Sequence, residues 1–301
     1  MSVATPIPTL HSNGCVLTPD HLGWLEPTEP ATSRAELWVR YREHGYLWLT
    51  GILDRAAVLR FRARFFEAFR ETGMLDPAFD TVDGVHAVGT TSPATATTAL
   101  LEEVVRWASF EAFCLAEPIL AFYEEFLGGA VFLHRRKLVR FTLPGDRKAT
   151  TPHYDLIYLR GGTERLCTSW IPIGDIPVEM GGLIYLERSH RWGRLAEEEF
   201  RRAAAALPPE ERISAFNRHM NAEAPLETDL HALAARASGR WLAANYAAGD
   251  MLVHDPYLVH AATENHDPAR RIRLSTDIRY QRVRDEVDAR WQHDWTADDR
   301  L

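Results

Sequence analysis

The stretch TTPHYDLIYL (residues 150–159) places a histidine and an aspartate one residue apart, His153 and Asp155, in a run that otherwise has the composition of a β-strand. In an extended chain alternate side chains share a face, so the two Cβ atoms are expected roughly 6–7 Å apart on one side of the strand. An imidazole and a carboxylate in that relation can clasp a metal ion. A third ligand has to be brought in by folding.

Short strand-like runs separated by Gly- and Pro-containing turns lie on both sides of this pair, which predicts β-structure for the second half of the chain. In the last of these runs apolar residues alternate with polar ones, as in a strand with one packed face and one polar face. A charge-rich insert (194–220) has a helical pattern. The runs are VFLHRRKLVRFTL (131–143), RLCTSWIPI (165–173), GLIYLERSH (182–190), GDMLVHDPYLVHAATEN (249–265) and RRIRLSTDIRYQ (270–281).

The first half of the chain is predicted to be mostly helical. Its Pro-rich start (1–33) is expected to wrap the surface as a loop, and residues 74–98 have no clear periodicity. The expected elements are a helix over 33–45 capped by Ser33 and ended by Gly45, a strand over 46–51, a helix from the Asp54 cap to Gly73, and a helical region over 99–127 that ends or kinks at Pro118.

Together these elements predict one domain over residues 1–301, mainly β with flanking α-helices. Residues 131–282 are expected to form a double-sheet jelly roll or barrel. The N-terminal helical part (34–127) is expected to pack on one of its sheets. Residues 191–248 are expected to form an insert that carries a helical lid.

Composition excludes several classes of protein. The 301 residues are 46% hydrophobic and 25% charged, as in ordinary folded proteins. The net charge of −8 and the absence of a basic stripe argue against nucleic acid as a partner. Because no basic leader and no run of about 18 apolar residues occurs, we expect a cytoplasmic protein without a membrane partner. Cys15, Cys114 and Cys167 are too far apart for a CxxC zinc site, so thiolate ligands are not expected.

The best candidate for the third ligand is His260, which follows a Gly249-Asp250 turn and a strand-like run. His254 lies inside that run, where a packed residue or a residue supporting a ligand is more typical. Two imidazoles and one carboxylate form the facial triad of non-haem Fe(II) oxygenases, although zinc tolerates the same ligands. The triad alone therefore leaves the metal open.

Arg271 stands eleven residues after His260 and could grip a carboxylate in a bidentate pair. A 2-oxo acid could then chelate iron at one end while the arginine holds the carboxylate at its other end. The alternative is that Arg271 and Arg273 are solvated charges on the polar face of a strand.

These residues, in this order, resemble the phytanoyl-CoA dioxygenase family of Fe(II)/2-oxoglutarate-dependent oxygenases. The resemblance runs from about residue 36 to about residue 282, and its N-terminal part is YREHGYLWLTGILD (41–54). An isolated HxD is a weak signal, whereas the ordered set with its His-to-Arg spacing is specific. The set is HYD (153–155), TSWIPIGD (168–175), GGLIYLERSH (181–190), Gly249-Asp250 before His260, Asn265 and Arg271.

The resemblance implies that residues 131–282 form a double-stranded β-helix, a jelly-roll and cupin-like fold, and it implies roles for particular residues. His153, Asp155 and His260 would be the iron ligands, and Arg271 would hold the distal carboxylate of 2-oxoglutarate. The strand with Thr168 and Trp170 would line the cofactor pocket, and Arg140 would be a further contact to the cosubstrate. Without the resemblance, Trp170 would be interpreted as a core residue and Arg140 as a surface charge.

The chain departs from the family pattern where Arg188 replaces a small residue before Ser-His. His190 is therefore interpreted as a structural residue. Because Arg273 shares a strand face with Arg271, the carboxylate clamp could lie two residues further along.

The resemblance predicts a dioxygenase that uses Fe(II), 2-oxoglutarate and O₂ on a small organic metabolite, for instance one of secondary metabolism. Because Asp155 leaves no ligand position vacant for a halide, hydroxylation is favoured over halogenation. A non-redox metal enzyme for hydrolysis or isomerisation, and a ligand-binding module with a vestigial site, remain as alternatives. Sequence does not identify the substrate or the oligomeric state.

Overall fold

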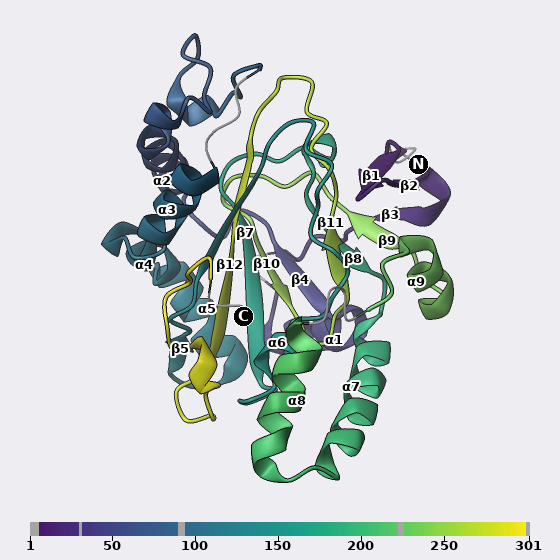
Figure 1. Ribbon diagram of the computed structural model, residues 1–301. Coiled ribbons are helices and arrows are strands. Elements are labelled where there is room, and N and C mark those ends of the chain that lie inside the picture. Colours follow the sequence, from purple (N-terminus) through teal and green to yellow (C-terminus); the bar gives the residue numbers. More distant parts are fainter. Residues whose placement is uncertain (1–5, 30–31, 90–93, 222–225, 299–301) are drawn as a thin grey trace.

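The computed structural model describes residues 6–29, 32–89, 94–221 and 226–298. Two sheets face each other without closing into a barrel (Figure 1). The larger sheet has the order β4-β10-β7-β12-β5, with β6 also paired to β12, and all its pairs are antiparallel. Its strands are β4 (Tyr46–Leu49), β10 (Met251–His254), β7 (Leu166–Pro172), β12 (Arg273–Arg282), β5 (Val131–Leu133) and β6 (Leu138–Thr142).

The smaller sheet has the order β11-β8-β9-β3 and extends the jelly roll predicted for residues 131–282. Its N-terminal strand runs parallel to β9, whereas the other pairs are antiparallel. The strands are β11 (His260–Ala262), β8 (Leu183–Leu186), β9 (Trp241–Ala243) and β3 (Leu22–Trp24). The predicted fold class is therefore confirmed.

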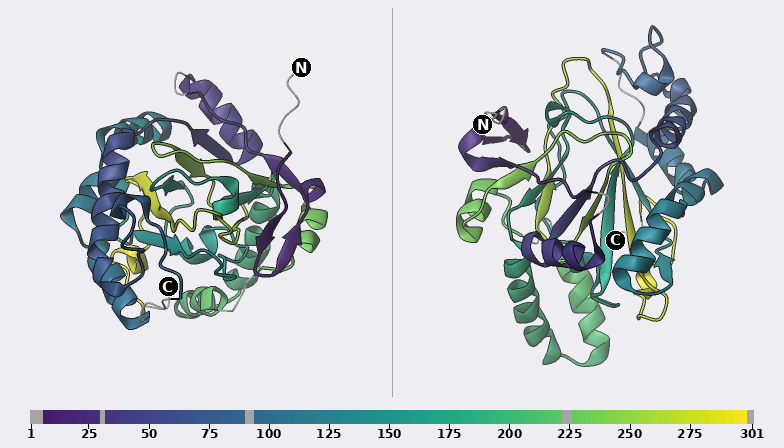
Figure 2. Two further views of the ribbon diagram at one scale, coloured as in Figure 1. Left: turned by 90° about the horizontal axis from the view of Figure 1, so that it is seen from above. Right: turned by 180° about the vertical axis from the view of Figure 1, so that it is seen from behind.

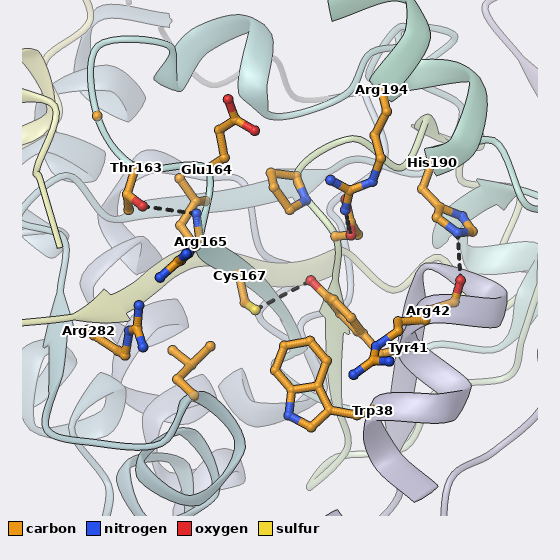
Figure 3. A pocket seen from close by; sticks show the side chains of 15 residues that line it. Trp38, Tyr41, Arg42, Thr163, Glu164, Arg165, Cys167, His190, Arg194 and Arg282 are labelled. Carbon is orange, nitrogen blue, oxygen red and sulfur yellow. Dashed lines mark hydrogen bonds and ion pairs between the residues drawn. The ribbon is translucent and has the colours of Figure 1, made fainter. Parts of the chain in front are cut away.

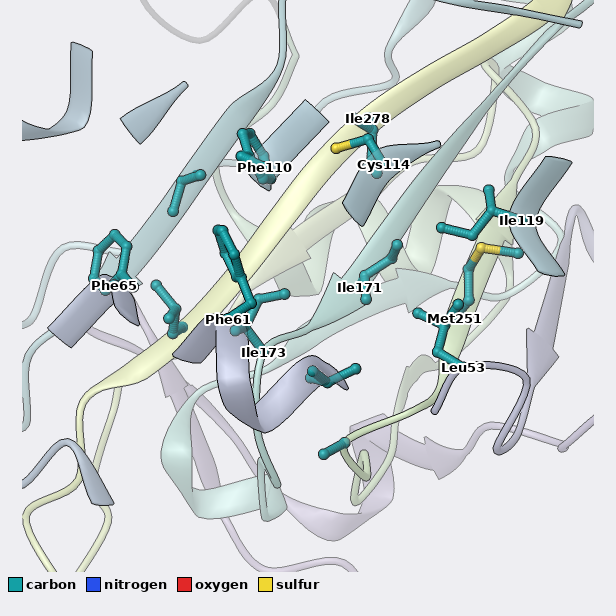
Figure 4. Close-up of a cluster of buried hydrophobic side chains, with 14 of the residues drawn as sticks. Leu53, Phe61, Phe65, Phe110, Cys114, Ile119, Ile171, Ile173, Met251 and Ile278 are labelled. Carbon is teal, nitrogen blue, oxygen red and sulfur yellow. The ribbon is translucent and has the colours of Figure 1, made fainter. Parts of the chain in front are cut away.

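Five helices from the first half flank the larger sheet: four lie in one layer outside it, as expected, and the first packs at the edge strand β4 and against the last of the four (Figures 1 and 2). Phe61, Phe65 and Phe110 from this layer pack against strand residues such as Ile171 and Ile278 (Figure 4). The helices are α1 (Arg34–His44), α2 (Arg55–Ala68), α3 (Ala94–Val104), α4 (Ala108–Cys114) and α5 (Glu117–Leu127).

Helix ends follow the capping signals. Ser33 forms a reciprocal capping box with Glu36, and Gly45 ends α1 with a φ of 81°. Asp54 caps α2 by accepting a hydrogen bond from the backbone N–H of Ala56. Pro118 lies in the first turn of α5, so the helical region expected over 99–127 is divided into separate helices rather than kinked.

Two expectations about irregular and extended segments were wrong. The N-terminal segment expected as a loop contains a hairpin, β1 (Leu10–Ser12) and β2 (Cys15–Leu17), before β3; residues 1–5 and 30–31 lie outside the described chain. Residues 156–159, expected to continue a strand, form the short helix α6 (Leu156–Leu159). The remaining short helices are η1 (Pro19–His21), η2 (Arg70–Thr72), η3 (Thr81–Asp83), η4 (Val178–Met180) and η5 (Ala289–Trp291).

The predicted helical insert is present as α7 (His190–Ala205), α8 (Pro209–Asn221) and α9 (Leu230–Ala237). Figure 1 shows α7 and α8 side by side below the sheets, with α6 next to them. Whether this pair acts as a lid remains a prediction. Among the helices of the described segments, none is long and apolar enough to cross a membrane.

The strand β12 positions polar side chains inside the molecule. Leu274, Ile278 and Tyr280 point outward into the core beneath the helices. The alternate residues Arg273 and Arg279 are each only 4% exposed. The polar face predicted from the alternation thus exists, but it faces the space between the sheets and not solvent.

Candidate metal centre

His153, Asp155 and His260 come together inside the jelly roll, and each offers a ligand atom within 4.8 Å of the other two. The Nε2 atoms of His153 and His260 each lie 3.9 Å from Oδ1 of Asp155. All three residues are buried. The structure therefore brings together the three side chains that the sequence predicted as ligands.

Backbone pairing sets this arrangement. His153 and His260 form an isolated antiparallel bridge, with backbone N···O distances of 3.0 and 2.9 Å between them. The chain then turns, because Asp155 has helical dihedral angles of −63° and −31° and precedes α6. Asp155 thus reaches the histidines from the start of a helix and not from an extended strand.

Each imidazole has its Nε2 atom available for a metal. Nδ1 of His153 lies 2.8 Å from the carbonyl oxygen of Thr151, and Nδ1 of His260 lies 2.9 Å from that of Leu258. A carbonyl oxygen only accepts, so Nδ1 carries the hydrogen and Nε2 keeps its lone pair in the neutral ring. Burial lowers the pKa of His153. Burial also holds the pKa of His260 well below its usual value, and the neighbouring rings of His153 and His254 add to that effect. Both rings are therefore neutral near pH 7.

The carboxylate of Asp155 is fixed at both oxygens. Its Oδ2 accepts hydrogen bonds from Thr168 Oγ1 and from Nε2 of His254, the latter at 3.1 Å. Its Oδ1, which faces the two imidazoles, lies 3.0 Å from Nη2 of Arg279. Burial alone would raise the pKa of Asp155, but Arg279 and the hydrogen bond from His254 outweigh burial and hold that pKa well below its usual value. The group is an anion with one oxygen directed toward the metal position.

His254 supports the carboxylate, as expected of a residue inside its strand. Its Nδ1 accepts a hydrogen bond from the hydroxyl of Tyr185 at 2.8 Å, so Nε2 carries the hydrogen donated to Asp155. His190 has the structural role expected of it, because its Nε2 bonds the backbone oxygen of Arg42 at 3.0 Å.

A small cavity adjoins the triad and is lined by His153, His260, Trp170, Arg140 and Arg273 among others. Its volume is about 20 Å³, which is room for about one water molecule. Arg140 and Asp277 form an ion pair at the cavity, so a larger ligand requires these side chains to move.

Arg273 is directed into this region, and Arg271 is not among the residues that line it. Arg273 is 4% exposed and bonds only hydroxyl oxygens in the described structure, those of Ser275 at 2.6 Å and Thr142 at 2.8 Å. Its Nε has no hydrogen-bond partner. Burial, with nearby Arg140, lowers the pKa of Arg273 to about 10, so the group is still a cation near neutral pH.

Arg271 instead forms a bidentate pair with Asp267, with N···O distances of 2.9 Å for both contacts, and its side chain is 33% exposed. Arg271 therefore lies away from the triad. Of the two arginines that the sequence left open as the carboxylate clamp, Arg273 is the one that lines the cavity.

The other residues predicted as cofactor contacts are close to the triad. Thr168 contacts Asp155, while Trp170 and Arg140 line the cavity. Sequence reasoning missed Arg279 and Asp277, which face the same space from β12. Their signal was the two-residue period shared with Arg273 along that strand.

A larger pocket of about 780 Å³ lies elsewhere and shares no lining residue with the triad cavity. Figure 3 shows Trp38 and Tyr41 of α1 on one side and Arg194 of α7 on another, with Cys167 between them. Arg194 is paired with Asp255 at 2.5 Å. Cavity size therefore does not mark the candidate metal centre in this fold; the ligand set does.

Known proteins are similar to this chain in sequence or in fold. A 1-deoxypentalenic acid 11-beta-hydroxylase from Streptomyces exfoliatus is 28% identical over 188 residues, a match that covers 57% of this chain. The same match covers 62% of that relative, which is less than two thirds of its length.

Solved structures resemble the fold at lower identity. The epimerase SnoN in complex with Fe³⁺, alpha ketoglutarate and nogalamycin RO is 18% identical, with a TM-score of 0.53 and coverage of 83% of both chains. The carbocyclase SnoK from nogalamycin biosynthesis is 19% identical, with a TM-score of 0.54 and coverage of 87% of this chain and 89% of its own. Residues 41–272 match the family model described as phytanoyl-CoA dioxygenase (PhyH), and the chain belongs to that family.

Proposed function

We propose that this chain is an Fe(II)/2-oxoglutarate-dependent dioxygenase that hydroxylates a C–H bond of a small organic metabolite. In that reaction one atom of O₂ enters the product and the other enters succinate, with release of CO₂ from 2-oxoglutarate. The observation that carries the proposal is the convergence of two neutral imidazoles and one carboxylate on one buried position. This donor set is that of the facial triad.

His153, Asp155 and His260 would hold Fe(II), which supplies activation of O₂ when it is bound. The available Nε2 lone pairs and the inward Oδ1 atom fit such an ion. Thr168 and His254 hold Asp155 in place through its other oxygen. These contacts keep the ligands in one geometry as the cosubstrate and substrate exchange.

We assign the distal carboxylate of 2-oxoglutarate to Arg273, in place of Arg271. A buried guanidinium that has hydroxyl partners but no ion pair in the described structure can bind a carboxylate with little loss of existing contacts. Arg140 would exchange Asp277 for the incoming ligand or move aside with it, and Trp170 would form a wall of the site.

The names of relatives support a small organic substrate. One is a hydroxylase of 1-deoxypentalenic acid, and the similar solved structures include an epimerase and a carbocyclase from nogalamycin biosynthesis. Such outcomes differ in where the substrate lies relative to the metal rather than in the ligands that hold it.

Succinate release from purified protein tests the proposal. With Fe(II), O₂ and 2-oxoglutarate we expect release of succinate that stops when Zn²⁺ replaces Fe(II), because zinc has no redox chemistry. Asp155→Ala should abolish both succinate release and tight binding of Fe(II). Succinate release that persists in Asp155→Ala, or that proceeds equally with zinc, would refute the proposed function.

A further inference from the structure

We propose that a groove outside the metal cavity binds the substrate, and that this substrate is a compact amphipathic organic acid. The inference rests on the proposed function and adds the place and chemical class of the substrate. The groove has a volume of about 290 Å³ and shares Arg140, Thr150 and Arg273 with the metal cavity. Because these three residues line both spaces, a molecule in the groove lies next to the metal cavity.

The charge of the groove favours an anion. Its lining contains the cations Arg140, Lys148 and Arg273, and no Asp or Glu of the described segments is among the lining residues. Lys148 is exposed, and its side chain forms no ion pair with another of the described residues. An anionic group at this position is attracted by Lys148 and Arg140, the two lining cations that we do not assign to the distal carboxylate of 2-oxoglutarate.

The charges around the metal cavity point the same way. Three guanidinium groups, those of Arg140, Arg273 and Arg279, face two carboxylates, those of Asp155 and Asp277. A divalent metal ion and a dianionic cosubstrate cancel each other, so one positive charge remains in excess when both are bound. Nε and Nη1 of Arg279 also have no hydrogen-bond partner in the described structure, so their N–H groups can donate to one further anionic group.

Most of the remaining lining residues of the groove are apolar. They include Leu101 of α3, Leu138 of β6 and Trp295 of the C-terminal segment. The lining thus combines an apolar surface with cations near Thr150, where the groove meets the metal cavity. The volume is at the lower end of the range for small-molecule sites, which fits a compact molecule.

Paired ligands test the charge requirement. Binding of octanoic acid and of adamantanecarboxylic acid is measured by calorimetry in anaerobic protein loaded with Co(II) and 2-oxoglutarate, and each acid is compared with its uncharged primary amide. We expect each acid to bind at least about tenfold more tightly than its amide, the ratio for loss of one charge-assisted contact. Equal binding of acid and amide, or no binding by either acid, overturns the proposal.

Charge reversal at the surface locates the site. Lys148→Glu should weaken binding of both acids by about threefold to tenfold, and Arg147→Glu is the matched control because Arg147 is exposed, adjacent and outside the lining. Leu101→Asp should weaken the same binding, whereas Leu195→Asp on exposed α7 should not. Equal effects of the variants and their controls would show a general charge effect and would overturn the location.

The cosubstrate provides the decisive comparison. If the groove is only the path by which 2-oxoglutarate reaches Arg273, Lys148→Glu will weaken 2-oxoglutarate binding as much as acid binding, and the inference is wrong. We expect the dissociation constant of 2-oxoglutarate to change by less than about twofold. Absence of 2-oxoglutarate binding in the unaltered protein would instead count against the proposed function, while acid binding in metal-free protein would still report on the groove.

Discussion

The two carboxylate oxygens of Asp155 make different contacts. Oδ2 is held by Thr168 and His254, and Oδ1 is left to face the imidazoles and Arg279. A carboxylate that accepts several hydrogen bonds remains ionised in a buried site. The metal-facing oxygen therefore needs neither deprotonation nor a large movement when an ion arrives.

Substitution of Arg273 and of Arg271 tests which of the two binds the distal carboxylate of 2-oxoglutarate. Arg273→Gln should raise the dissociation constant of 2-oxoglutarate by about a hundredfold, because a charge-assisted contact worth about 2–3 kcal/mol is lost. Arg271→Gln should change it by less than about threefold, since Arg271 is paired with Asp267 away from the cavity. Anaerobic titration of the absorption of the Fe(II) complex measures both values. A larger effect at Arg271 would restore the clamp first predicted from the sequence.

A change at Thr168 tests the support of the carboxylate. Thr168→Val removes the hydrogen bond to Oδ2 with little change in volume and should weaken binding of Fe(II) or Co(II) by about tenfold. Thr276→Val is the control, because it also loses the hydrogen bond of a buried threonine, to the carbonyl of Leu138, but does not contact Asp155. Metal affinity measured by calorimetry should distinguish the two variants. Equal losses of metal affinity would mean that Thr168 affects metal binding only through the stability of the fold.

At the scale of an element, β12 shows what the sequence could predict. The alternation of apolar and polar residues correctly indicated a strand with two unlike faces. It could not say that the polar face is buried, because a solvated face and a charged interior have the same two-residue period. The position of the proposed clamp, Arg273, also depends on the turn before the strand, where Asn265 and Asp267 bind the backbone of Arg271 and β12 begins at Arg273.

The HYD segment shows a different limit. His153 and Asp155 do lie together with His260, as the sequence predicted, but the run LIYL after them forms α6 and not a strand. Four apolar residues have no decisive periodicity, so their structure is decided by packing. Leu156, Ile157 and Leu159 are all buried in a cluster that also contains Tyr154 and Trp291, which are distant from each other in the sequence. That contact has no local sequence signal.

Glu197 of α7 is a buried carboxylate that contacts residues on both sides of Asp155 and α6. Glu197 accepts hydrogen bonds from the hydroxyl of Tyr154 at 3.1 Å and from Nε of Arg160 at 2.8 Å, and the Arg160 and Glu197 side chains are at most 1% exposed. Tyr154 and Arg160 flank Asp155 and α6 in the chain. The insert therefore helps to position Asp155, a proposed metal ligand, whether or not it also closes over the site.

Neutralising this carboxylate tests the coupling. Glu197→Gln leaves the Arg160 guanidinium buried without its counter-charge and should lower the free energy of unfolding by about 3 kcal/mol. It should also weaken metal binding several-fold, whereas Glu198→Gln on the exposed side of α7 should change neither. Urea unfolding and metal titration of the folded protein measure the two effects. Unchanged metal affinity in folded Glu197→Gln would show that α7 stabilises the fold without positioning Asp155.

At the scale of the whole molecule, apolar and ionisable groups are segregated. The space beneath the N-terminal helices is filled by a continuous apolar cluster, while arginines, aspartates and histidines lie between the sheets. The outer cluster supplies the hydrophobic stabilisation that lets the interior hold charged and polar groups. This arrangement makes the stability of the protein sensitive to protonation of its buried histidines.

His134 offers a measure of that sensitivity away from the metal ligands. It is 1% exposed, and its Nε2 donates to Oε1 of Gln281 at 2.7 Å; burial lowers its pKa to about 4. The unfolded chain, with a histidine pKa of about 6.5, binds the proton first as pH falls, so stability is present above about pH 6.5 and declines toward pH 4. This histidine alone should account for up to about 3 kcal/mol of that decline.

His134→Asn keeps a donor for Gln281 but does not titrate, so it should flatten the decline between about pH 6.5 and pH 4. The exposed His293→Asn is the control and should leave the slope as it is. Urea unfolding of metal-free protein across this range gives the free energies. Asp155 acts in the same direction only at lower pH, because its pKa lies well below the usual carboxyl range. An unchanged slope in His134→Asn would mean that the acid sensitivity resides in other groups, with the buried His153 and His260 as the next to be replaced.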